Sequence, residues 1–310
     1  MCKIVTVTFN PCVDKSTSIS ALIPEKKLRC ATPKFEPGGG GINVARAIKK
    51  LGGEALAIYP AGGYSGKFLN DLLRKENIYT NSIETISHTR ENLVVLDQST
   101  NKQYRFGMPG PTLLEKEWQQ CLDVLEKQDS EYIIVSGSLP QGLPVDIIAR
   151  IARIANRKNQ KLIVDTNGLP LKYALEEGVY MIKPNLGELS VFLDGEATLE
   201  TGTMIAKEIV NKGLSQIVVV SLGASGALLV TENKSVQFIP PAVRKISTVG
   251  AGDSMVAGIV WKLSNGWTVK ESVQYGVACG TAATMNPATE LCHLNDADKL
   301  FNSMQKAILV

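Results

Sequence analysis

The chain has 310 residues, of which 44% are hydrophobic and 20% are charged, a balance typical of soluble globular proteins. Its 33 basic and 30 acidic residues are spread along the sequence, so there is no basic stripe for nucleic acid and no lysine-rich arm for a membrane. No apolar run approaches the roughly 20 residues needed to span a bilayer, and the first residues resemble a strand rather than a signal peptide. We therefore expect no nucleic-acid partner and no membrane partner.

The six cysteines are scattered without a C-x-x-C pair, and only two histidines occur, His88 and His293. This spacing indicates neither a disulfide framework nor a zinc site, and two histidines argue against a Ser-His-Asp triad. Unpaired cysteines are usual in a reducing compartment, so we expect a cytoplasmic protein.

Short apolar segments alternate with helical patterns along most of the chain. Strands are expected at 3–8, 55–59, 132–136, 161–165, 180–182, 217–221, 227–231 and 236–239. Helices are expected at 42–51, 65–76, 112–128, 145–157, 186–193, 201–212, 252–264, 269–285 and 295–307. This alternation predicts an α/β fold in which helices cover both faces of a mostly parallel sheet.

Two β-rich stretches, near 14–35 and 90–107, interrupt this alternation. The second contains a pair of strands expected at 92–97 and 103–107, which would form an antiparallel pair around a turn. We expect both stretches to form a small sheet apart from the main one, as a lid. No linker rich in proline, serine or charge is present, so residues 1–310 are predicted to form one domain.

The sequence Gly250-Ala251-Gly252-Asp253 opens an apolar segment that predicts a buried helix. Glycine lets several backbone N–H groups face one point, and the amino end of a helix adds unpaired N–H groups and the positive end of its dipole. Such a site suits a phosphate or a developing oxyanion. Asp253 would repel a bound anion, but it makes sense as a base that deprotonates an attacking hydroxyl. Alternatively, Asp253 only caps the helix.

A second glycine run, Gly38 to Gly41, precedes another predicted helix. It is not a dinucleotide fingerprint, because Val44 occupies the last glycine position and the next strand ends in Pro60 without a ribose-binding acid. Glycine backbone approaching a polyhydroxy ligand fits better, with Asn43 as hydrogen-bond donor and acceptor. A tight loop without a ligand is the alternative, but four glycines are entropically costly for that role alone.

Two further segments follow predicted strands. Asn185 and Glu188, just after Lys183, have the spacing of a capping box, and the same groups could hold hydrated magnesium near phosphates. The segment from Ser221 to Ala227 is either a plain turn or a set of glycine amides facing a nucleotide phosphate.

Four basic residues lie on or beside the expected lid: Lys27, Arg29, Arg90 and Arg105. Basic residues at exposed strand edges commonly prevent edge-to-edge pairing. Several on one small element could also bind a phosphate dianion through charge-assisted hydrogen bonds. The sequence alone leaves both interpretations open.

The motifs Gly-Gly-Gly-Gly-Ile-Asn-Val-Ala-Arg and Thr-Val-Gly-Ala-Gly-Asp-Ser-Met together resemble the two signature regions of the ribokinase-like sugar kinases, also called the phosphofructokinase-B family. The resemblance runs from the first expected strand to the last expected helix. It implies a ribokinase-like α/β/α sandwich whose β-sheet lid often also forms a dimer interface. We therefore expect a homodimer through the lid.

Further matches within this family are Lys-Leu-Arg-Cys at 27–30, Phe-Glu-Pro-Gly-Gly-Gly-Gly at 35–41, Gln-Tyr-Arg-Phe at 103–106 and Ser-Gly-Ser-Leu-Pro at 136–140. They are most similar to members that use ATP and magnesium to phosphorylate the 1-hydroxyl of fructose 6-phosphate, forming fructose 1,6-bisphosphate in glycolysis. The alternatives are kinases for tagatose 6-phosphate or fructose 1-phosphate. These usually carry lysine at the third position of the glycine run, where this chain has Gly40.

The resemblance also implies roles for residues at matching positions. Asp253 would be the catalytic base, and the backbone of Gly250, Ala251 and Gly252 would form the anion hole. The sugar phosphate would be held by Asp14, Lys27, Gly38, Gly39, Asn43, Arg90, Arg105 and Ser138. The nucleotide would face Lys183, Asn185, Ser221, Gly223 and Gly226, and Glu188 would support magnesium indirectly.

Two positions depart from the family pattern. Gly187 stands where close relatives carry lysine, a difference that bears on regulation by nucleotide. Glu290 stands where they carry arginine, and it bears on a potassium site that the resemblance places near Ser247, Val249 and Asn286.

Overall fold

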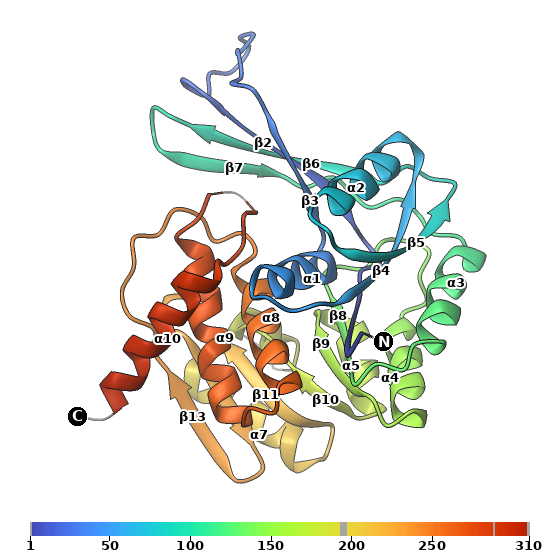
Figure 1. Ribbon diagram of the computed structural model, residues 1–310, viewed down its shortest axis with the longest axis vertical. Coiled ribbons are helices and arrows are strands. Elements are labelled where there is room, and N and C mark those ends of the chain that lie inside the picture. Colours follow the sequence, from blue (N-terminus) through green and yellow to red (C-terminus); the bar gives the residue numbers. More distant parts are fainter. Residues whose placement is uncertain (1, 193–196, 288, 309–310) are drawn as a thin grey trace.

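The computed structural model describes residues 2–192, 197–287 and 289–308. Within these residues the strands form two separate sheets, a 9-stranded sheet and a 4-stranded sheet. Figure 1 shows helices on both faces of the large sheet, with the small sheet projecting beyond it. The expected α/β architecture, with a small additional sheet, is therefore confirmed.

The large sheet has the strand order β13-β12-β11-β10-β9-β8-β1-β4-β5. The strands from β11 to β5 in this order pair in parallel, whereas β11, β12 and β13 pair antiparallel. The bounds are β1 (Ile4–Val7), β4 (Leu56–Gly62), β5 (Tyr79–Thr85), β8 (Tyr132–Ser136), β9 (Lys161–Asp165), β10 (Val179–Ile182), β11 (Ser215–Ser221), β12 (Ala227–Thr231) and β13 (Lys234–Phe238). Because the seven neighbouring strands from β11 to β5 pair in parallel, their carboxyl ends lie along one edge of the sheet.

The small sheet has the order β3-β2-β6-β7, and we call it, with the connecting residues 20–33, the lid. Its strands are β2 (Cys12–Ile19), β3 (Lys34–Gly38), β6 (Arg90–Asp97) and β7 (Lys102–Phe106). β2 pairs with β3 antiparallel and with β6 parallel, and β6 pairs with β7 antiparallel. Both segments expected to form the lid therefore meet in one sheet, and the predicted β6–β7 pair is confirmed.

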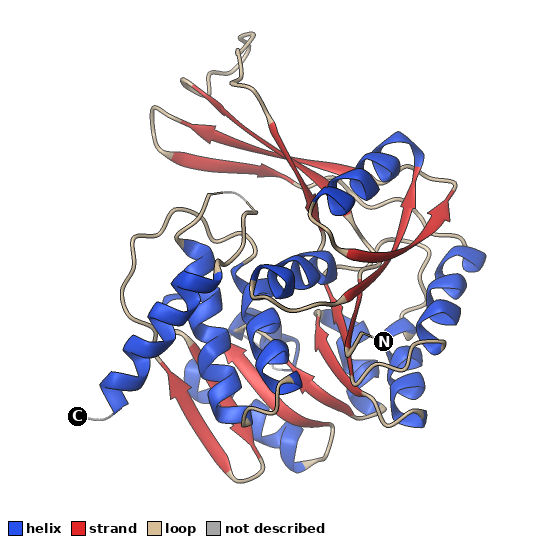
Figure 2. Cartoon of the chain, in the orientation of Figure 1, coloured by secondary structure: helices blue, strands red, loops and turns tan. Residues whose placement is uncertain are grey.

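The helices divide between two buried clusters, one on each face of the large sheet (Figure 2). One face carries α1 (Gly40–Lys50), α2 (Gly63–Lys75), α8 (Ala251–Ser264), α9 (Val269–Thr284) and α10 (Leu294–Ile308). The other carries α3 (Glu115–Glu126), α4 (Ile147–Arg157), α5 (Gly168–Glu176) and α7 (Leu199–Asn211). Shorter turns are α6 (Leu186–Leu189), η1 (Ser190–Phe192) and η2 (Gly223–Ser225). None of the described helices is long and apolar enough to cross a membrane.

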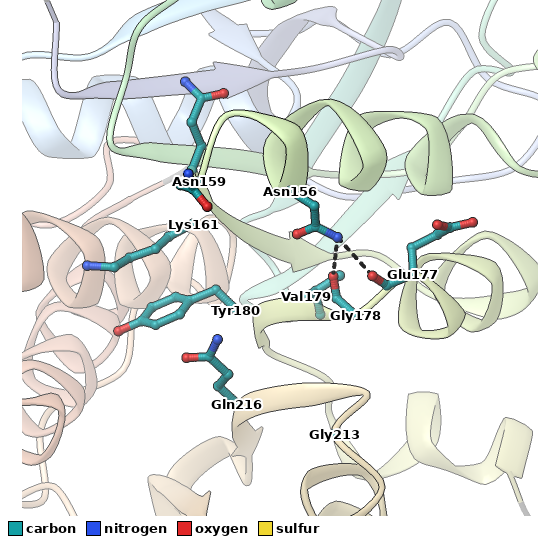
Figure 3. Close-up of a pocket in the computed structure, with 10 residues that line it drawn as sticks. Asn156, Asn159, Lys161, Glu177, Gly178, Val179, Tyr180, Gly213 and Gln216 are labelled. Carbon is teal, nitrogen blue, oxygen red and sulfur yellow. Dashed lines mark hydrogen bonds between the residues drawn. The ribbon is translucent and has the colours of Figure 1, made fainter.

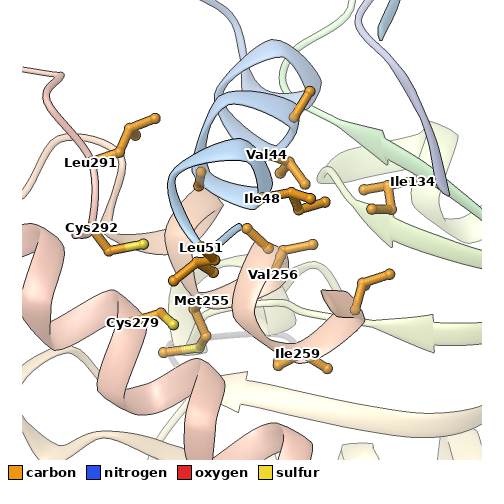
Figure 4. Packing of buried hydrophobic residues seen from close by; sticks show 14 of the residues in the cluster. Val44, Ile48, Leu51, Ile134, Met255, Val256, Ile259, Cys279, Leu291 and Cys292 are labelled. Atoms are coloured by element: carbon orange, nitrogen blue, oxygen red, sulfur yellow. The ribbon is translucent and has the colours of Figure 1, made fainter. Parts of the chain in front are cut away.

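Helices α1 and α8 pack together over β8, as Figure 4 shows. Val44 and Ile48 of α1 meet Val256 and Ile259 of α8, with Ile134 of β8 beneath them, and all five side chains are 0% exposed. Burying each such side chain contributes about 1.5–3 kcal/mol. This packing fixes the amino ends of two helices side by side, and each of those ends carries one of the glycine motifs.

The structure differs from the sequence prediction at several elements. β5 is not predicted by its pattern, because it is an edge strand with mostly polar side chains. α5 is not predicted either, because Pro170 suggests a loop, although proline is tolerated in the first turn of a helix. The strand expected at 55–59 continues through Pro60 to Gly62. Residues 186–192 of the helix expected at 186–193 form the short α6 followed by η1, and residue 193 lies outside the described residues.

Candidate active site

Polar side chains gather where the parallel strands of the large sheet end. Ser136 is the last residue of β8, Asp165 is the last of β9, and Lys183 directly follows β10. The amino ends of α1 and α8 contribute Asn43 and Asp253 to the same place, because hydrogen bonds join these side chains to one another. Ligands of open parallel sheets bind at this edge, so we take it as the candidate active site.

The amino end of helix α8 has the glycine conformation that is expected of an anion-binding helix end. Its N-cap residue, Gly250, has φ 71°, a left-handed conformation that glycine adopts without strain. Asp253 is the third residue of the helix, and its carboxylate is hydrogen-bonded to the side chains of Asn43 and Ser136. The alternative that Asp253 serves as the helix cap is therefore wrong. Its carboxylate instead lies beside the positive end of the helix dipole.

Asp253 accepts two hydrogen bonds from neighbouring elements. Nδ2 of Asn43 lies 3.0 Å from its Oδ2, and Oγ of Ser136 lies 3.4 Å from its Oδ1. Burial, followed by the nearby negative charge of Asp165, raises the pKa of Asp253 to about 6, although Asn43 and Lys183 partly oppose this. A carboxyl group with this pKa is ionised at neutral pH and is a better proton acceptor than an ordinary aspartate.

Asp165 is a site residue that the sequence analysis missed. Its Oδ1 lies 3.1 Å from Nζ of Lys183, and its Oδ2 lies 3.4 Å from Oγ of Ser136, whose single hydroxyl proton is shared between Asp165 and Asp253. Burial lowers the pKa of Lys183, but the charge and hydrogen bond of Asp165 outweigh it, so the net pKa is raised and Lys183 is a buried cation. The sequence does mark Asp165 as a candidate site residue, because Asp165 is an acid at the carboxyl end of an apolar strand in a parallel sheet.

The glycine run at the start of α1 has a steric explanation. A side chain at Gly40 would clash with Oγ of Ser136, and a Cβ at Gly41 would lie 2.6 Å from Oγ1 of Thr8. Gly39 has φ 109°, which other residues rarely adopt. The close packing of α1 on the ends of β1 and β8 therefore requires these glycines. The same packing places Asn43 beside Asp253.

A pocket of about 460 Å³ lies between the lid and the large sheet. Asn10, Arg90 and Ser138 line it, together with residues 107–110 and 139–141. Arg90 donates from Nη1 to the carbonyl of Met108 at 3.1 Å and from Nη2 to the carbonyl of Asn10 at 3.0 Å. Nδ2 of Asn10 donates to Oγ of Ser138 at 2.9 Å. Asn10, which the sequence analysis did not select, is therefore hydrogen-bonded to Arg90 and Ser138, two of the residues predicted to bind the sugar phosphate.

The lid carries the remaining residues that were predicted to hold the sugar phosphate. Asp14 accepts a hydrogen bond from Asn92 at 2.9 Å and packs against Gly38, where a Cβ would clash with it. Arg105 reaches from β7 to Oγ1 of Thr248 at 3.2 Å, two residues before Gly250. Lys27 is different, because it belongs to the 20–33 connection, which Figure 1 shows at the end of the lid farthest from the large sheet. In the part of the chain that the structure describes, this connection is therefore remote from the large sheet, where Asp253 lies.

The predicted nucleotide-binding residues follow β10 or lie at and after the end of β11. Asn185 and Glu188 form the expected capping box, with Asn185 Oδ1 and Glu188 Oε2 each accepting a backbone N–H at 2.8 Å. The N–H of Ser221 donates to the carbonyl of Pro184, which joins this segment to β11. Gly223 and Gly226 then shape the η2 turn, and both have positive φ. Lys183, Asn185 and Ser221 are therefore neighbours, and their binding of a nucleotide stays a prediction.

A second pocket, of about 420 Å³, lies at the opposite edge of the large sheet (Figure 3). Lys161, Val179 and Gln216 line it, and these residues lie at the amino ends of β9, β10 and β11. Nδ2 of Asn156 donates to the carbonyls of Glu177 and Gly178 along its wall. The residues that line this pocket include none of the predicted site residues, so it is separate from the candidate active site.

The fold, with a buried carboxylate at a helix amino end and a lid, is that of the sugar kinases, and residues 4–296 match the model of the pfkB family of carbohydrate kinases. The chain belongs to this family. The ATP-dependent 6-phosphofructokinase isozyme 2 of Escherichia coli is 44% identical over 304 residues, which cover 97% of this chain and 98% of the relative. The 1-phosphofructokinase of Borreliella burgdorferi is 31% identical, with 96% of each chain covered.

Solved structures of the E. coli phosphofructokinase-2 superpose closely on this chain. The complex with fructose 6-phosphate has a TM-score of 0.92 at 42% identity, and the complex with potassium has a TM-score of 0.94 at 43% identity. Both matches cover 98% of this chain and 100% of the solved chain. The ribokinase-like fold is therefore shown over nearly the whole chain.

Proposed function

We propose that this chain is an ATP- and magnesium-dependent kinase that phosphorylates the 1-hydroxyl of fructose 6-phosphate. The observation that carries the proposal is the position of Asp253, which lies at the amino end of α8 and is hydrogen-bonded to Asn43 and Ser136. A binding protein gains nothing from a carboxylate beside an anion site, whereas a phosphoryl-transfer enzyme needs a base there. Family membership and the 44% identical relative support the same activity.

In the proposed reaction, Asp253 takes the proton from the 1-hydroxyl of the sugar as its oxygen attacks the γ-phosphorus of ATP. A new P–O bond forms, the bond between the γ-phosphorus and the bridging oxygen breaks, and ADP leaves. The backbone of Gly250 to Gly252, at the positive end of the helix dipole, offsets the charge that builds on the transferred group. Lys183 adds a fixed positive charge, and a Cβ at Gly252 would lie only 3.5 Å from its Nζ.

Glu188 is the residue proposed to hold magnesium, through water. Carboxylate oxygens are suitable magnesium ligands, and only Oε2 of Glu188 is used in the capping bond. Among the described residues no three His, Cys, Asp or Glu side chains gather to hold a metal directly, which fits a magnesium ion bound mainly by phosphates. Bound there, magnesium supplies positive charge that neutralises the ATP phosphates.

Potassium is a further proposed cofactor, near Ser247, Val249 and Asn286. Asn286 donates from Nδ2 to the carbonyls of Leu291 and Ala282, which leaves its Oδ1 as an oxygen ligand. Backbone and side-chain carbonyl oxygens are the ligands that replace the hydration shell of potassium.

The rival proposals are kinases for fructose 1-phosphate or tagatose 6-phosphate. Gly40 argues against them, because Ser136 leaves no room there for the lysine that those kinases usually carry. The test is kcat/KM, from a coupled assay of ADP release at saturating ATP, for fructose 6-phosphate, fructose 1-phosphate, tagatose 6-phosphate and free fructose. Fructose 6-phosphate is expected to give the highest value, with tagatose 6-phosphate a weaker substrate because one hydroxyl has the opposite configuration. A higher value for any other acceptor would overturn the substrate assignment.

We also propose that the lid joins two copies of the chain into a homodimer located in the cytoplasm. The lid has exposed apolar side chains, among them Leu22, Ile23, Tyr104 and Phe106. The outer strands β3 and β7 leave sheet edges that a second copy would cover. If Lys27 binds the sugar phosphate, as the resemblance implies, the position of its connection at the far end of the lid suits the site of the other copy.

A further inference from the structure

Arg46 is the largest of the almost fully buried side chains, at 2% exposed. A buried guanidinium group is costly unless its N–H groups are paired. Nε and Nη2 of Arg46 donate to the two carboxylate oxygens of Glu76 at 2.8 and 2.7 Å. Nη2 also lies 3.9 Å from the buried carboxylate of Glu36. These carboxylates therefore pair the Nε and Nη2 side of the guanidinium group.

The other side of the guanidinium group faces the candidate active site. Nη1 donates to the carbonyl of Pro37 at 2.9 Å, to Oδ1 of Asn43 at 3.3 Å and to the carbonyl of Thr289 at 3.3 Å. All three bonds are buried. One nitrogen of Arg46 therefore joins Pro37 and Asn43, which are nearby in the sequence, to Thr289, which is 243 positions away.

Each of these residues supports the site. Pro37 directly precedes the glycine run. Thr289 is two residues before Leu291, which is buried with φ 65° and packs against Gly250, so closely that a Cβ at Gly250 would clash with its Cδ2. Asn43 donates to the base Asp253.

The bond between Arg46 and Asn43 decides which end of the Asn43 amide faces Asp253. A guanidinium group has no acceptor, so only Oδ1 of Asn43 can face it, and Nδ2 must then point away. Nδ2 lies 3.0 Å from Oδ2 of Asp253. If the amide were rotated by half a turn, its carbonyl oxygen would face the carboxylate and repel it.

We infer that Arg46 is a positioning residue for proton transfer, because it orients the Asn43 amide so that this amide donates to Asp253. The inference deepens the proposed kinase function and rests on it. The hydrogen bonds of Arg46 go to Glu76, Pro37, Asn43 and Thr289 and not to Asp253, so it acts through Asn43. The other groups that face Asp253 belong to other elements: Ser136 on β8, Asp165 on β9, Lys183 after β10 and Cys12 on β2. Asp253 accepts hydrogen bonds from Asn43 and Ser136, and the bond from Asn43 lowers the pKa of Asp253 more. Loss of the Asn43 bond should therefore raise the pKa of Asp253.

The test compares Arg46→Lys with the control Glu76→Gln. Lysine keeps the positive charge but lacks the planar fork, so it cannot hold Glu76 and Asn43 at once. In Arg46→Lys, kcat should fall at least about tenfold, KM for the sugar phosphate should change less than kcat, and the acid limb of the pH–rate profile should move upward. Glu76→Gln weakens the far side of the guanidinium group only. It should lower Tm while leaving kcat and the acid limb as in the wild type.

A readout without turnover separates this inference from the proposed function. The ¹³C carboxyl signal of Asp253 is titrated by NMR in the substrate-free protein, and its pKa should be higher in Arg46→Lys than in the wild type. An unchanged pKa together with a Tm loss like that of Glu76→Gln would show that Arg46 is only structural. If Arg46→Lys does not fold, Asn43→Ser carries the same titration, and an unchanged Asp253 pKa there overturns the inference. Failure of the wild type to phosphorylate fructose 6-phosphate would overturn the proposed function alone.

Discussion

Nδ2 of Asn43 lies 3.0 Å from Oδ2 of Asp253, although the two residues are 210 positions apart in the chain. Each belongs to one of the two glycine motifs, and each sits near the amino end of its helix, α1 or α8. The hydrogen bond therefore shows that the two motifs build one site. It also gives Asp253 a fixed direction, as a base needs if it is to meet a substrate hydroxyl.

Asp253→Asn should preserve the fold and ATP binding but lower kcat by about 10²–10⁴-fold. The substitution is nearly isosteric and keeps an oxygen that can accept from Asn43, so it removes only the base. The measurement is turnover with fructose 6-phosphate, alongside a thermal melt. Turnover within tenfold of the wild type would contradict the assignment of Asp253 as base.

The pH–rate profile should have an acid limb near pH 6. Burial and the nearby charge of Asp165 raise the pKa of Asp253 to about 6. A base must be deprotonated, so kcat/KM, which reports the free enzyme, should be nearly constant well above pH 6 and fall about tenfold for each pH unit below it. The check is kcat/KM for fructose 6-phosphate between pH 5 and 8, with Tm recorded at each pH to exclude unfolding. A limb near the ordinary value for aspartate would show that Asp253 is not the titrating group.

The sequence was sufficient to predict the fold class, the lid segments and the two helix amino ends, because each is encoded locally by periodicity or by glycine. It was also sufficient for the Asn185–Glu188 capping box, which needs only a three-residue spacing. Asp165 could have been predicted, since it ends an apolar strand. β5 and α5 were missed because a polar edge strand and a helix with an early proline lack a clear periodic signal.

Other site residues could not be predicted, because their roles depend on contacts across the whole chain. Asn10 donates to Ser138, 128 residues away, and Arg46 donates to the carbonyl of Thr289, 243 residues away. No local pattern marks either residue. The 20–33 connection, which contains Lys27, likewise lies at the far end of the lid because β2 pairs with β3 and β6. The sequence alone does not show this pairing.

Glu188→Gln should raise the magnesium concentration needed for half-maximal activity while costing about 1 kcal/mol or less in stability. Glutamine can still accept the N–H of Asn185, but it is a weaker ligand for hydrated magnesium. Glu271→Gln is the matched control, because Glu271 completes the same kind of capping box with Thr268 on α9. Equal magnesium dependence in both variants would leave Glu188 with a capping role only.

The protein should sediment as a dimer at micromolar concentration, and Lys27→Ala should lower kcat/KM for fructose 6-phosphate. The exposed apolar residues of the lid need covering, and a second lid would cover them. The control is Lys116→Ala, a change of the same charge on α3, which should leave both the mass and kcat/KM unchanged. A fully active monomer would contradict the dimer. Full activity of the Lys27 variant would remove Lys27 from the site.

Arg90→Ala should lower kcat/KM for fructose 6-phosphate by about 10–150-fold, the loss expected for one or two charge-assisted hydrogen bonds to a phosphate. Arg90 lines the pocket beside Ser138, and it is held there by the carbonyls of Asn10 and Met108. These bonds aim a cation into the pocket, which a neutral sugar does not require. The loss should therefore be much smaller for free fructose, which has no phosphate to bind.

The control for Arg90→Ala is Arg153→Ala. Arg153 on α4 pairs with Glu177 at 2.9 Å, beside the pocket at the opposite edge of the large sheet. It should leave kcat/KM for both acceptors unchanged. The decisive quantity is the ratio of kcat/KM for fructose 6-phosphate to that for fructose, because a general loss of folded enzyme lowers both values equally. If Arg90→Ala leaves this ratio as in the wild type, Arg90 does not bind the phosphate, and the residues that select the substrate lie elsewhere in the lid.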